Sequence, residues 1–276
     1  MLPAPDMFII RGGKMTEAMQ TYLYRSPIPN LKILASQQIG DGEFTSNELA
    51  PHKGVMCVAG KRSPLGPFVQ FSEGDPAFQL YLTDLLPRPY RYSWSFPNEE
   101  LYQELAGRLG SAEFSKMAVY TRPPGGLLPT GPARQLTKAD RTALLELRPD
   151  SAKALTGRKE VRLFGVIEDG HWVADAWVLP MYGRHWAVND LTVHPDYLRR
   201  GYGKAALAAC LNFLSEAGMT AVYETDEDNA PSRHLVEGLG FRLEAVQAIG
   251  RGTLDWPPSE QAVEFFRRAE SIPAPR

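Results

Sequence analysis

Apolar and polar positions alternate in two different ways along the first half of the 276-residue chain. Short apolar and aromatic runs bounded by Gly, Pro or Asn predict strands, and these runs occupy residues 55–60, 67–72, 90–96 and 114–121. Apolar residues at helical spacing predict helices over 14–24 and 98–110, the second starting with Asn98 and two acidic residues as N-terminal caps do. We therefore expect an α+β first half with a mostly antiparallel sheet.

The second half has a clearer order of elements. A predicted helix at about 138–148 precedes three strand-like runs, 161–169, 171–180 and 185–193, separated by short turns with glycine. A helix over 203–217, a strand over 221–226, a helix over 230–239 and a last strand from Phe241 follow. The three runs predict an antiparallel meander. A helical crossover returns the chain in the same direction, so the strand at 221–226 should lie parallel to its neighbour.

Residues 123–132, "PPGGLLPTGP", separate the two halves. Seven of these ten residues are Pro or Gly, so neither a helix nor a sheet continues easily through them. We expect an N-terminal α+β domain over 1–122, a linker over 123–132 and a second domain over 133–276. A chain of this length with 43% hydrophobic residues is long enough to bury two cores.

Charge and composition exclude several classes of partner. The net charge is −2, so no overall basic field favours a nucleic acid or an anionic membrane. The N-terminus resembles no signal peptide, and no apolar run approaches the roughly 20 residues that span a bilayer. We expect a cytoplasmic protein without nucleic-acid or membrane partners, and the composition leaves a homodimer open.

The chain has two cysteines, Cys57 and Cys210, too few for a disulfide framework or a metal cluster. Cys210 shares a helix face with Leu207, Leu211 and Leu214, which favours a buried thiol over a nucleophile. No metal site is predicted.

The stretch "HPDYLRRGYGKAAL", residues 194–207, carries the strongest candidate chemistry. Gly201 and Gly203 allow positive φ angles and close approach of a ligand, and the following helix offers unpaired N–H groups. Arg199, Arg200 and Lys204 add cations, so the loop predicts a site for phosphate oxygens. The alternative is a helix start with surface charges.

Two familiar phosphate loops fit this stretch poorly. Lys204 is followed by Ala205, so the hydroxyl with which a Walker loop holds magnesium is missing. A dinucleotide loop follows the first strand of a parallel βαβ unit, whereas this loop follows a meander and has Ala206 at the third glycine position.

Residues 191–241, "LTVHPDYLRRGYGKAAL…EAGMTAVYETDEDNAPSRHLVEGLGF", resemble the GNAT superfamily of acyl-CoA-dependent N-acyltransferases. The resemblance implies the GNAT fold, an α+β (α/β) arrangement with a mixed, mostly antiparallel sheet flanked by helices. It also implies that the first half is either a degenerate second copy of this fold or a substrate-side domain, as in glycine N-acyltransferase-like members.

The same resemblance assigns cofactor roles to particular residues. The strand holding Leu191, Thr192 and Val193 would separate from its neighbour at a bulge, and its main chain would pair with the pantetheine arm of CoA. The CoA pyrophosphate would be held by the main-chain amides of Arg199, Arg200, Gly201, Tyr202, Gly203 and Lys204. Asn229 and Ser232 would lie near the cofactor arm on the other side of the opening.

The resemblance implies acetyl transfer from acetyl-CoA to a small-molecule primary amine by direct attack, without a metal. Three positions depart from the family: Leu198 stands where Arg or Gln is usual in the loop, Val236 where a Tyr often protonates the thiolate, and Ala187 where a Glu often acts as base. Candidates for the missing base are His185, Asp190 and Glu224. Alternation along a strand places His185 and Asn189 on one face and Asp190 on the other.

Three alternatives stay open from the sequence. The chain could be a non-catalytic acyl-CoA sensor that has lost its acid and base, or a protein that binds another nucleotide at the glycine loop. In the first half, Tyr90, Tyr92, Trp94 and Phe96 could line an acceptor pocket or alternate between core and surface.

Overall fold

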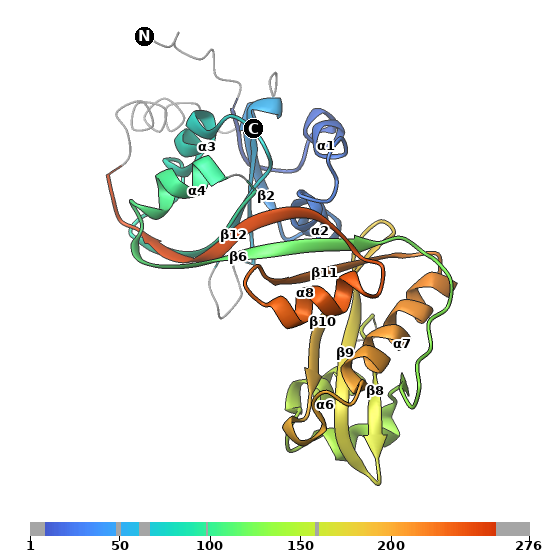
Figure 1. Ribbon diagram of the computed structural model, residues 1–276. Helices are drawn as coiled ribbons and strands as arrows, with labels where there is room; N and C mark the ends of the chain where they lie inside the picture. Colours follow the sequence, from blue (N-terminus) through green and yellow to red (C-terminus); the bar gives the residue numbers. More distant parts are fainter. Residues whose placement is uncertain (1–8, 48–50, 61–66, 98, 158–159, 258–276) are drawn as a thin grey trace. The chain divides into compact units, whose positions relative to one another are not determined.

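The computed structural model describes residues 9–47, 51–60, 67–97, 99–157 and 160–257. The chain divides into two compact units (Figure 1). Unit 1 comprises Met1–Met117 together with Ala245–Arg276, and unit 2 comprises Ala118–Glu244.

Unit 1 is an α+β unit built on a mostly antiparallel set of strands. Strands β1 to β4 pair antiparallel in chain order, β4 and β5 pair parallel, and β12 lies antiparallel to β5. Helices α1 and α2 lie on one side of the strands and α3 and α4 on the other (Figure 1). The elements are β1 (Ile9–Gly13), α1 (Glu17–Leu23), α2 (Leu31–Ile39), β2 (Glu43–Asn47), β3 (Val55–Ala59), β4 (Phe68–Phe71), α3 (Pro76–Thr83), β5 (Tyr90–Phe96), α4 (Glu99–Ala106), the first part of β6 (Gly110–Arg122) and most of β12 (Arg242–Leu254).

Aromatic side chains of β5 fill the core of unit 1 on the side of α3 and α4. Trp94 and Phe96 are completely buried, and their rings stack with centroids 5.8 Å apart. Leu101 and Leu105 of α4 belong to the same buried cluster. Trp94 and Phe96 are therefore core residues, but the expected alternation between core and surface is wrong here, since Ser93 and Ser95 between them are buried as well.

Unit 2 contains the predicted meander. Strands β7 to β10 pair antiparallel in chain order, and β11 lies parallel to β10, as the helical crossover predicts. The second part of β6 is the other neighbour of β11. The elements are β7 (Arg134–Gln135), α5 (Arg141–Leu144), α6 (Pro149–Gly157), β8 (Arg162–Glu168), β9 (His171–Tyr182), β10 (His185–Val193), α7 (Tyr202–Glu216), β11 (Thr220–Asp226) and α8 (Ala230–Glu237).

Two cores cover the opposite faces of the meander in unit 2. Residues such as Val178 and Val188 pack with α7, which runs along β8 and β9 (Figure 1). Leu163 and Trp172 pack with Leu144 of α5 and Ala152 of α6. Strand side chains alternate between faces, so β8 and β9 each contribute residues to both cores.

Along the chain, the elements β1 to β6 and the elements β7 to β12 repeat one order and pairing, although most of β12 belongs to unit 1. In both, a strand, two helices and three antiparallel strands lead to a helical crossover, a parallel strand, another helix and a final long strand. By this order β4, α3 and β5 correspond to β10, α7 and β11. The pattern supports the prediction that the first half is a degenerate second copy.

The observed division of the chain differs from the predicted one. The Pro/Gly segment 123–132 belongs to unit 2, and the residues from Ala245 onward belong to unit 1 because β12 pairs along β5. Leu128 explains the first difference: its N–H donates to Asn212 Oδ1 at 2.8 Å, and Asn212 Nδ2 donates back to its carbonyl at 2.9 Å. The segment is thus fastened to α7.

Three helices are absent from the predictions, namely α2, α3 and α6. Helix α6 buries small residues, Ala152 and Ala154, which leave a weak hydrophobic period in the sequence. The helix predicted at 138–148 is present only as a 3₁₀ turn followed by α5. Within the described part of the chain, no helix is long and apolar enough to cross a membrane.

Candidate active site

The parallel strands β10 and β11 separate partway along their length. Their register runs from His185 opposite Thr220 to Val188 opposite Tyr223, although β10 continues to Val193 and β11 to Asp226. Beyond that last pair, no paired residues join the two described strands. We call this unpaired part of β10 and β11 the splay; it includes Leu191, Thr192 and Val193, where a separation of the strands is predicted.

A β-bulge in β10 begins where the splay opens. Asn189 lies opposite Trp177 and Thr192 opposite Asp175, so β10 has one residue more than β9 between these pairs. Asp190 has a φ of 57°, which is uncommon for a residue other than glycine. The bulge predicted for this strand is therefore present.

The bulge corrects the predicted direction of Asp190. Its carboxylate contacts Arg148, which precedes α6, at 2.5 Å. It therefore points to the side covered by α5 and α6, the side on which strict alternation places Asn189. The extra residue of a bulge interrupts alternation, and for that reason a simple strand model fails at this position.

Arg148 also holds a buried carboxylate, Asp175. Arg148 Nε donates to Asp175 Oδ1 at 2.9 Å, Ser151 donates to Oδ2 at 2.6 Å, and Trp172 Nε1 donates to Oδ1 at 2.8 Å. Burial raises the pKa of Asp175, while the bonds from Ser151 and Arg148 act in the opposite direction. Arg148 thus ties Asp190 to a fixed group in β9 and stabilises the bulge. The sequence analysis missed this network, although an Asp between alanines in a buried strand is a usable signal.

The glycine loop has the backbone expected of an anion site. Gly201 is the N-terminal cap of α7, with a φ of 86° and no side-chain cap, and Arg199 also has a positive φ, 60°. The N–H groups of the first helical turn have no intrahelical acceptor, and the helix dipole adds positive potential there. Arg199, Arg200 and Lys204 are exposed around this helix end. The predicted loop residues are thus brought together.

Close packing joins this loop to the splay. A Cβ atom on Gly203 would meet Val193 Cγ2 at 3.0 Å, so the loop lies directly against the end of β10. Tyr202 donates to Glu168 Oε1 at 2.6 Å, and the Arg200 guanidinium lies 5.3 Å from the centre of the Tyr197 ring. These contacts position the helix start beside the bulged strand.

A cavity of about 430 Å³ lies beside the same helix end. Arg200 and Lys204 line it together with the Pro/Gly segment that is fastened to α7. Residues 128–132, predicted as part of a linker, therefore form one wall of the cavity.

On the other side of the splay, α8 is fixed by its own cap. Asn229 Oδ1 accepts from the N–H of Ser232 at 3.2 Å, so this side-chain oxygen serves the helix. The Ser232 hydroxyl is hydrogen-bonded to the Tyr223 hydroxyl at 3.0 Å. Ser232 is one helical turn before the fully buried Val236. The sequence analysis did not identify Tyr223, because an aromatic residue in an apolar strand is typical of a core position.

The remaining base candidates lie at different distances from the splay. His185 is at the closed end of the parallel pairing, about 13 Å along the strand from Asn189. Burial lowers the pKa of His185. Glu224 directly follows the last paired residue, Tyr223, and is partly exposed. By alternation its side chain leaves the strand on the side opposite Tyr223.

Neither cysteine has the setting of a nucleophile. Both side chains are completely buried, and burial raises the pKa of Cys57 to about 12 and that of Cys210 as well. A thiol that stays protonated does not attack a thioester readily. Among the described residues, no group of three or more His, Cys, Asp or Glu side chains could hold a metal ion.

The family comparison agrees with this geometry. The model of the acetyltransferase (GNAT) family matches residues 133–241, the segment that contains the splay, the loop and α8. Residues 133–241 form a domain of the GNAT fold. The GNAT fold predicted from the sequence is confirmed.

Solved GNAT structures resemble more of the chain than this domain. A GNAT-family acetyltransferase from Colwellia psychrerythraea is 13% identical, with a TM-score of 0.53, over 88% of this chain and 99% of its own. A GCN5-related N-acetyltransferase from Kribbella flavida is 16% identical, with a TM-score of 0.52, over 86% and 96%. A tandem GNAT protein from the clavulanic acid biosynthesis pathway is 12% identical, with a TM-score of 0.56, over 89% and 98%. Among curated proteins, none matches the chain in sequence.

The corresponding helix of unit 1 lacks an anion site of the GNAT type. Helix α3 begins after Asp75, whose Oδ1 accepts from the N–H of Ala77 at 3.0 Å. This carboxylate occupies the helix start and repels anions, whereas Gly201 leaves the start of α7 open. The GNAT domain of unit 2 is therefore the better candidate for binding CoA.

Proposed function

We propose that the protein transfers the acetyl group of acetyl-CoA to a small-molecule primary amine by direct attack of the amine nitrogen. The observation that supports this most is the contact of Gly203 with Val193. It places an uncapped helix start, suited to a pyrophosphate, next to the part of β10 that is not paired with β11. In CoA a pyrophosphate is covalently joined to a pantetheine arm that contains amides. The helix start fits the pyrophosphate, and the neighbouring strand fits the pantetheine arm.

In this proposal the backbone provides most of the cofactor binding. The main-chain groups of Leu191, Thr192 and Val193 pair with the pantetheine arm, as an added strand would. The amides of residues 199–204 bind the pyrophosphate, and the side chains of Arg200 and Lys204 add charge. Ser232 lies along the arm, and Asn229 acts through the cap of α8.

Glu224 is the proposed base. It is the first residue of β11 beyond the paired part, so its carboxylate leaves the strand where a thioester in the splay would lie. Asp190 is less suited, because its carboxylate is engaged in the ion pair with Arg148. The position of His185 at the closed end of the pairing is unfavourable for contact with the acceptor.

Tyr223 is the proposed proton donor to the departing thiolate. It would replace the Tyr that other family members often have at the position of Val236, since valine has no proton to give. Its hydroxyl reaches the face of α8 that carries Ser232 and Val236. Burial raises the pKa of Tyr223, so the phenol keeps its proton well above neutral pH. Acid and base would then lie on opposite sides of the sheet, and the amine would lose its proton on one side while sulfur gains one on the other.

The proposal is tested with the wild-type protein, acetyl-CoA and a panel of primary amines, with released thiol as the readout. We expect saturable CoA binding and thiol release that depends on the amine. Tight CoA binding without turnover of any acceptor would instead support the sensor alternative, which the buried Ala187 and Val236 favour. ATP or NAD binding as tightly as CoA in a competition assay would support the nucleotide alternative.

Replacing Tyr223 by phenylalanine is expected to lower kcat about tenfold without changing the Kd of CoA, because a thiolate departs with only modest help. Tyr120→Phe is the matched control, since Tyr120 is also buried and its hydroxyl contacts Glu237 of α8 at 2.8 Å. Kinetics with thioesters of lower leaving-group pKa should show a smaller difference between wild type and Tyr223→Phe. Equal effects of the two variants would argue against a proton-donor role.

A further inference from the structure

Unit 1 contains a cavity of about 500 Å³ that the proposed acetyl-transfer mechanism does not use. Its volume is within the range of about 300 to 1,000 Å³ typical of small-molecule sites. Protein interiors rarely leave space larger than a water molecule unfilled, because side chains on such a surface lose packing contacts. A space of this size with a largely apolar lining is therefore a candidate binding site.

The floor of the cavity is one face of the sheet of unit 1. Glu43 lies opposite Val58, and Thr45 opposite Met56, in the register of β2 and β3. Directly opposite residues share a face, so all four side chains line the same side. Leu86, after the end of α3, adds an apolar wall.

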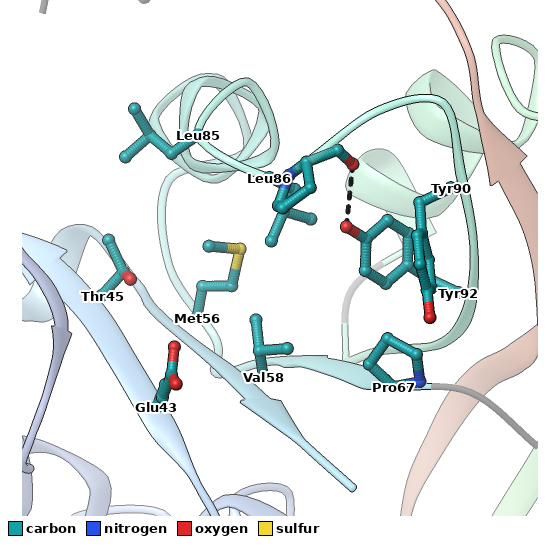
Figure 2. Close-up of a pocket in the computed structure, with 10 residues that line it drawn as sticks. Glu43, Thr45, Met56, Val58, Pro67, Leu85, Leu86, Tyr90 and Tyr92 are labelled. Atoms are coloured by element: carbon teal, nitrogen blue, oxygen red, sulfur yellow. Dashed lines mark hydrogen bonds between the residues drawn. The ribbon is translucent and has the colours of Figure 1, made fainter. Parts of the chain in front are cut away.

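The opposite side of the cavity is aromatic. Figure 2 shows Tyr90 and Tyr92 across the space from Glu43. Tyr92 is fixed because its hydroxyl donates to the carbonyl of Pro87 at 2.8 Å, and Tyr90 stands beside it with ring centroids 5.0 Å apart. Tyr90 is 46% exposed and Tyr92 only 3%, so the pair extends from the rim into the cavity.

The charge of the cavity selects the class of ligand. Burial raises the pKa of Tyr92 to about 12, so this ring is neutral at pH 7. Among the described lining residues Glu43 is the only carboxylate, and none is Lys, Arg or His. An ammonium group can contact Glu43 and donate to the Thr45 hydroxyl, whereas the carboxylate of an anionic ligand would be repelled by that of Glu43.

We propose that this cavity binds a primary ammonium compound with an aromatic or bulky apolar body. The ammonium group contacts Glu43, and the body packs between Met56 and the rings of Tyr90 and Tyr92. Aromatic rings favour such a body through packing and edge or offset stacking. Because Asp75 blocks the helix start of α3, this ligand is of a different class from CoA.

The test uses three probes of similar shape, 2-phenylethylammonium, 2-phenylethanol and phenylacetate, in calorimetric titrations of the full chain. We expect the ammonium compound to bind at least about tenfold more tightly than the alcohol, since a hydrogen bond to a charged group exceeds a neutral one. Phenylacetate should bind most weakly. Equal affinities for the three, or no binding of the ammonium compound, would overturn the proposal.

Variants locate the site. Glu43→Gln should weaken binding of the ammonium compound about tenfold and leave that of the alcohol unchanged, and Tyr90→Ala should weaken both. Glu43 has an interaction of its own within the protein, so the isosteric glutamine is used and thermal unfolding checks that the variant is folded. Glu100→Gln, at an exposed glutamate of α4, is the matched control.

An unchanged affinity in a folded Glu43→Gln protein would refute the assignment of this carboxylate. CoA titrations are independent of these results, so failure here leaves the proposed function untouched.

Discussion

Replacement of Gly203 by leucine is expected to raise the Kd of CoA at least about 100-fold, or about 2.7 kcal/mol. Even the Cβ atom would lie 3.0 Å from Val193 Cγ2, and the remaining side chain needs space that β10 occupies. The loop must move away from β10, so the proposed pyrophosphate and pantetheine sites lose their mutual spacing. Binding of CoA is measured by calorimetric titration.

A glycine elsewhere in unit 2 provides the control. An added Cβ atom on Gly157, the last residue of α6, would meet no atom within 4 Å, and the residue is exposed. Gly157→Leu should therefore leave the CoA affinity unchanged. Thermal unfolding of both variants separates loss of the site from loss of the fold. A folded Gly203→Leu protein with wild-type affinity would remove the main support for the CoA assignment.

Local sequence signals predicted the part of the fold that carries the loop. The meander, the parallel strand β11 and helices α7 and α8 each have their own period, cap or turn residues, so a short window suffices. The glycine loop was found for the same reason: Gly201 marks a positive φ that other residues adopt poorly, and Gly203 marks a close approach to Val193.

Contacts between distant residues could not be found in this way. The pairing of β12 with β5 joins residues more than 150 positions apart, and it moves the division of the chain away from the Pro/Gly segment. Arg148 meets Asp175 and Asp190 only through the fold, since Arg148 lies between α5 and α6, Asp175 in β9 and Asp190 in β10. The hydroxyl of Tyr223 likewise became a candidate proton donor only because the fold places it in contact with Ser232 of α8.

The two units share one order of pairing but differ at the start of the crossover helix, and this difference explains why one of them carries the candidate site. Corresponding crossovers lead from β4 to β5 and from β10 to β11, yet only the second begins with an uncapped glycine. In the first, Asp75 caps its own helix. Two units with the same order of elements can therefore differ in their suitability for an anion through one residue at the helix start.

The second large effect is expected from Glu224→Gln, which should lower kcat/KM about 10²- to 10³-fold, the usual contribution of a general base. An alkylamine is almost entirely protonated at pH 7, so removal of a proton at the splay limits the reaction. The amide keeps the size of the side chain but binds no proton, so the Kd of CoA should not change.

Comparison variants decide whether this loss reflects chemistry. Asp226→Asn, at the exposed end of the same strand, and His185→Asn, at the closed end of the pairing, should each cost less than about fivefold. Assays at rising pH provide a second criterion, because more of the acceptor amine is then already unprotonated and Glu224→Gln should recover part of its rate. A loss that stays constant with pH would point to a structural role of Glu224, and a larger loss in His185→Asn would move the base to the other end of β10. Glu224 is assigned as the base only if Glu224→Gln loses more activity than the comparison variants and also recovers part of its rate at higher pH. A carboxylate that only stabilises the strand would not show the recovery with pH.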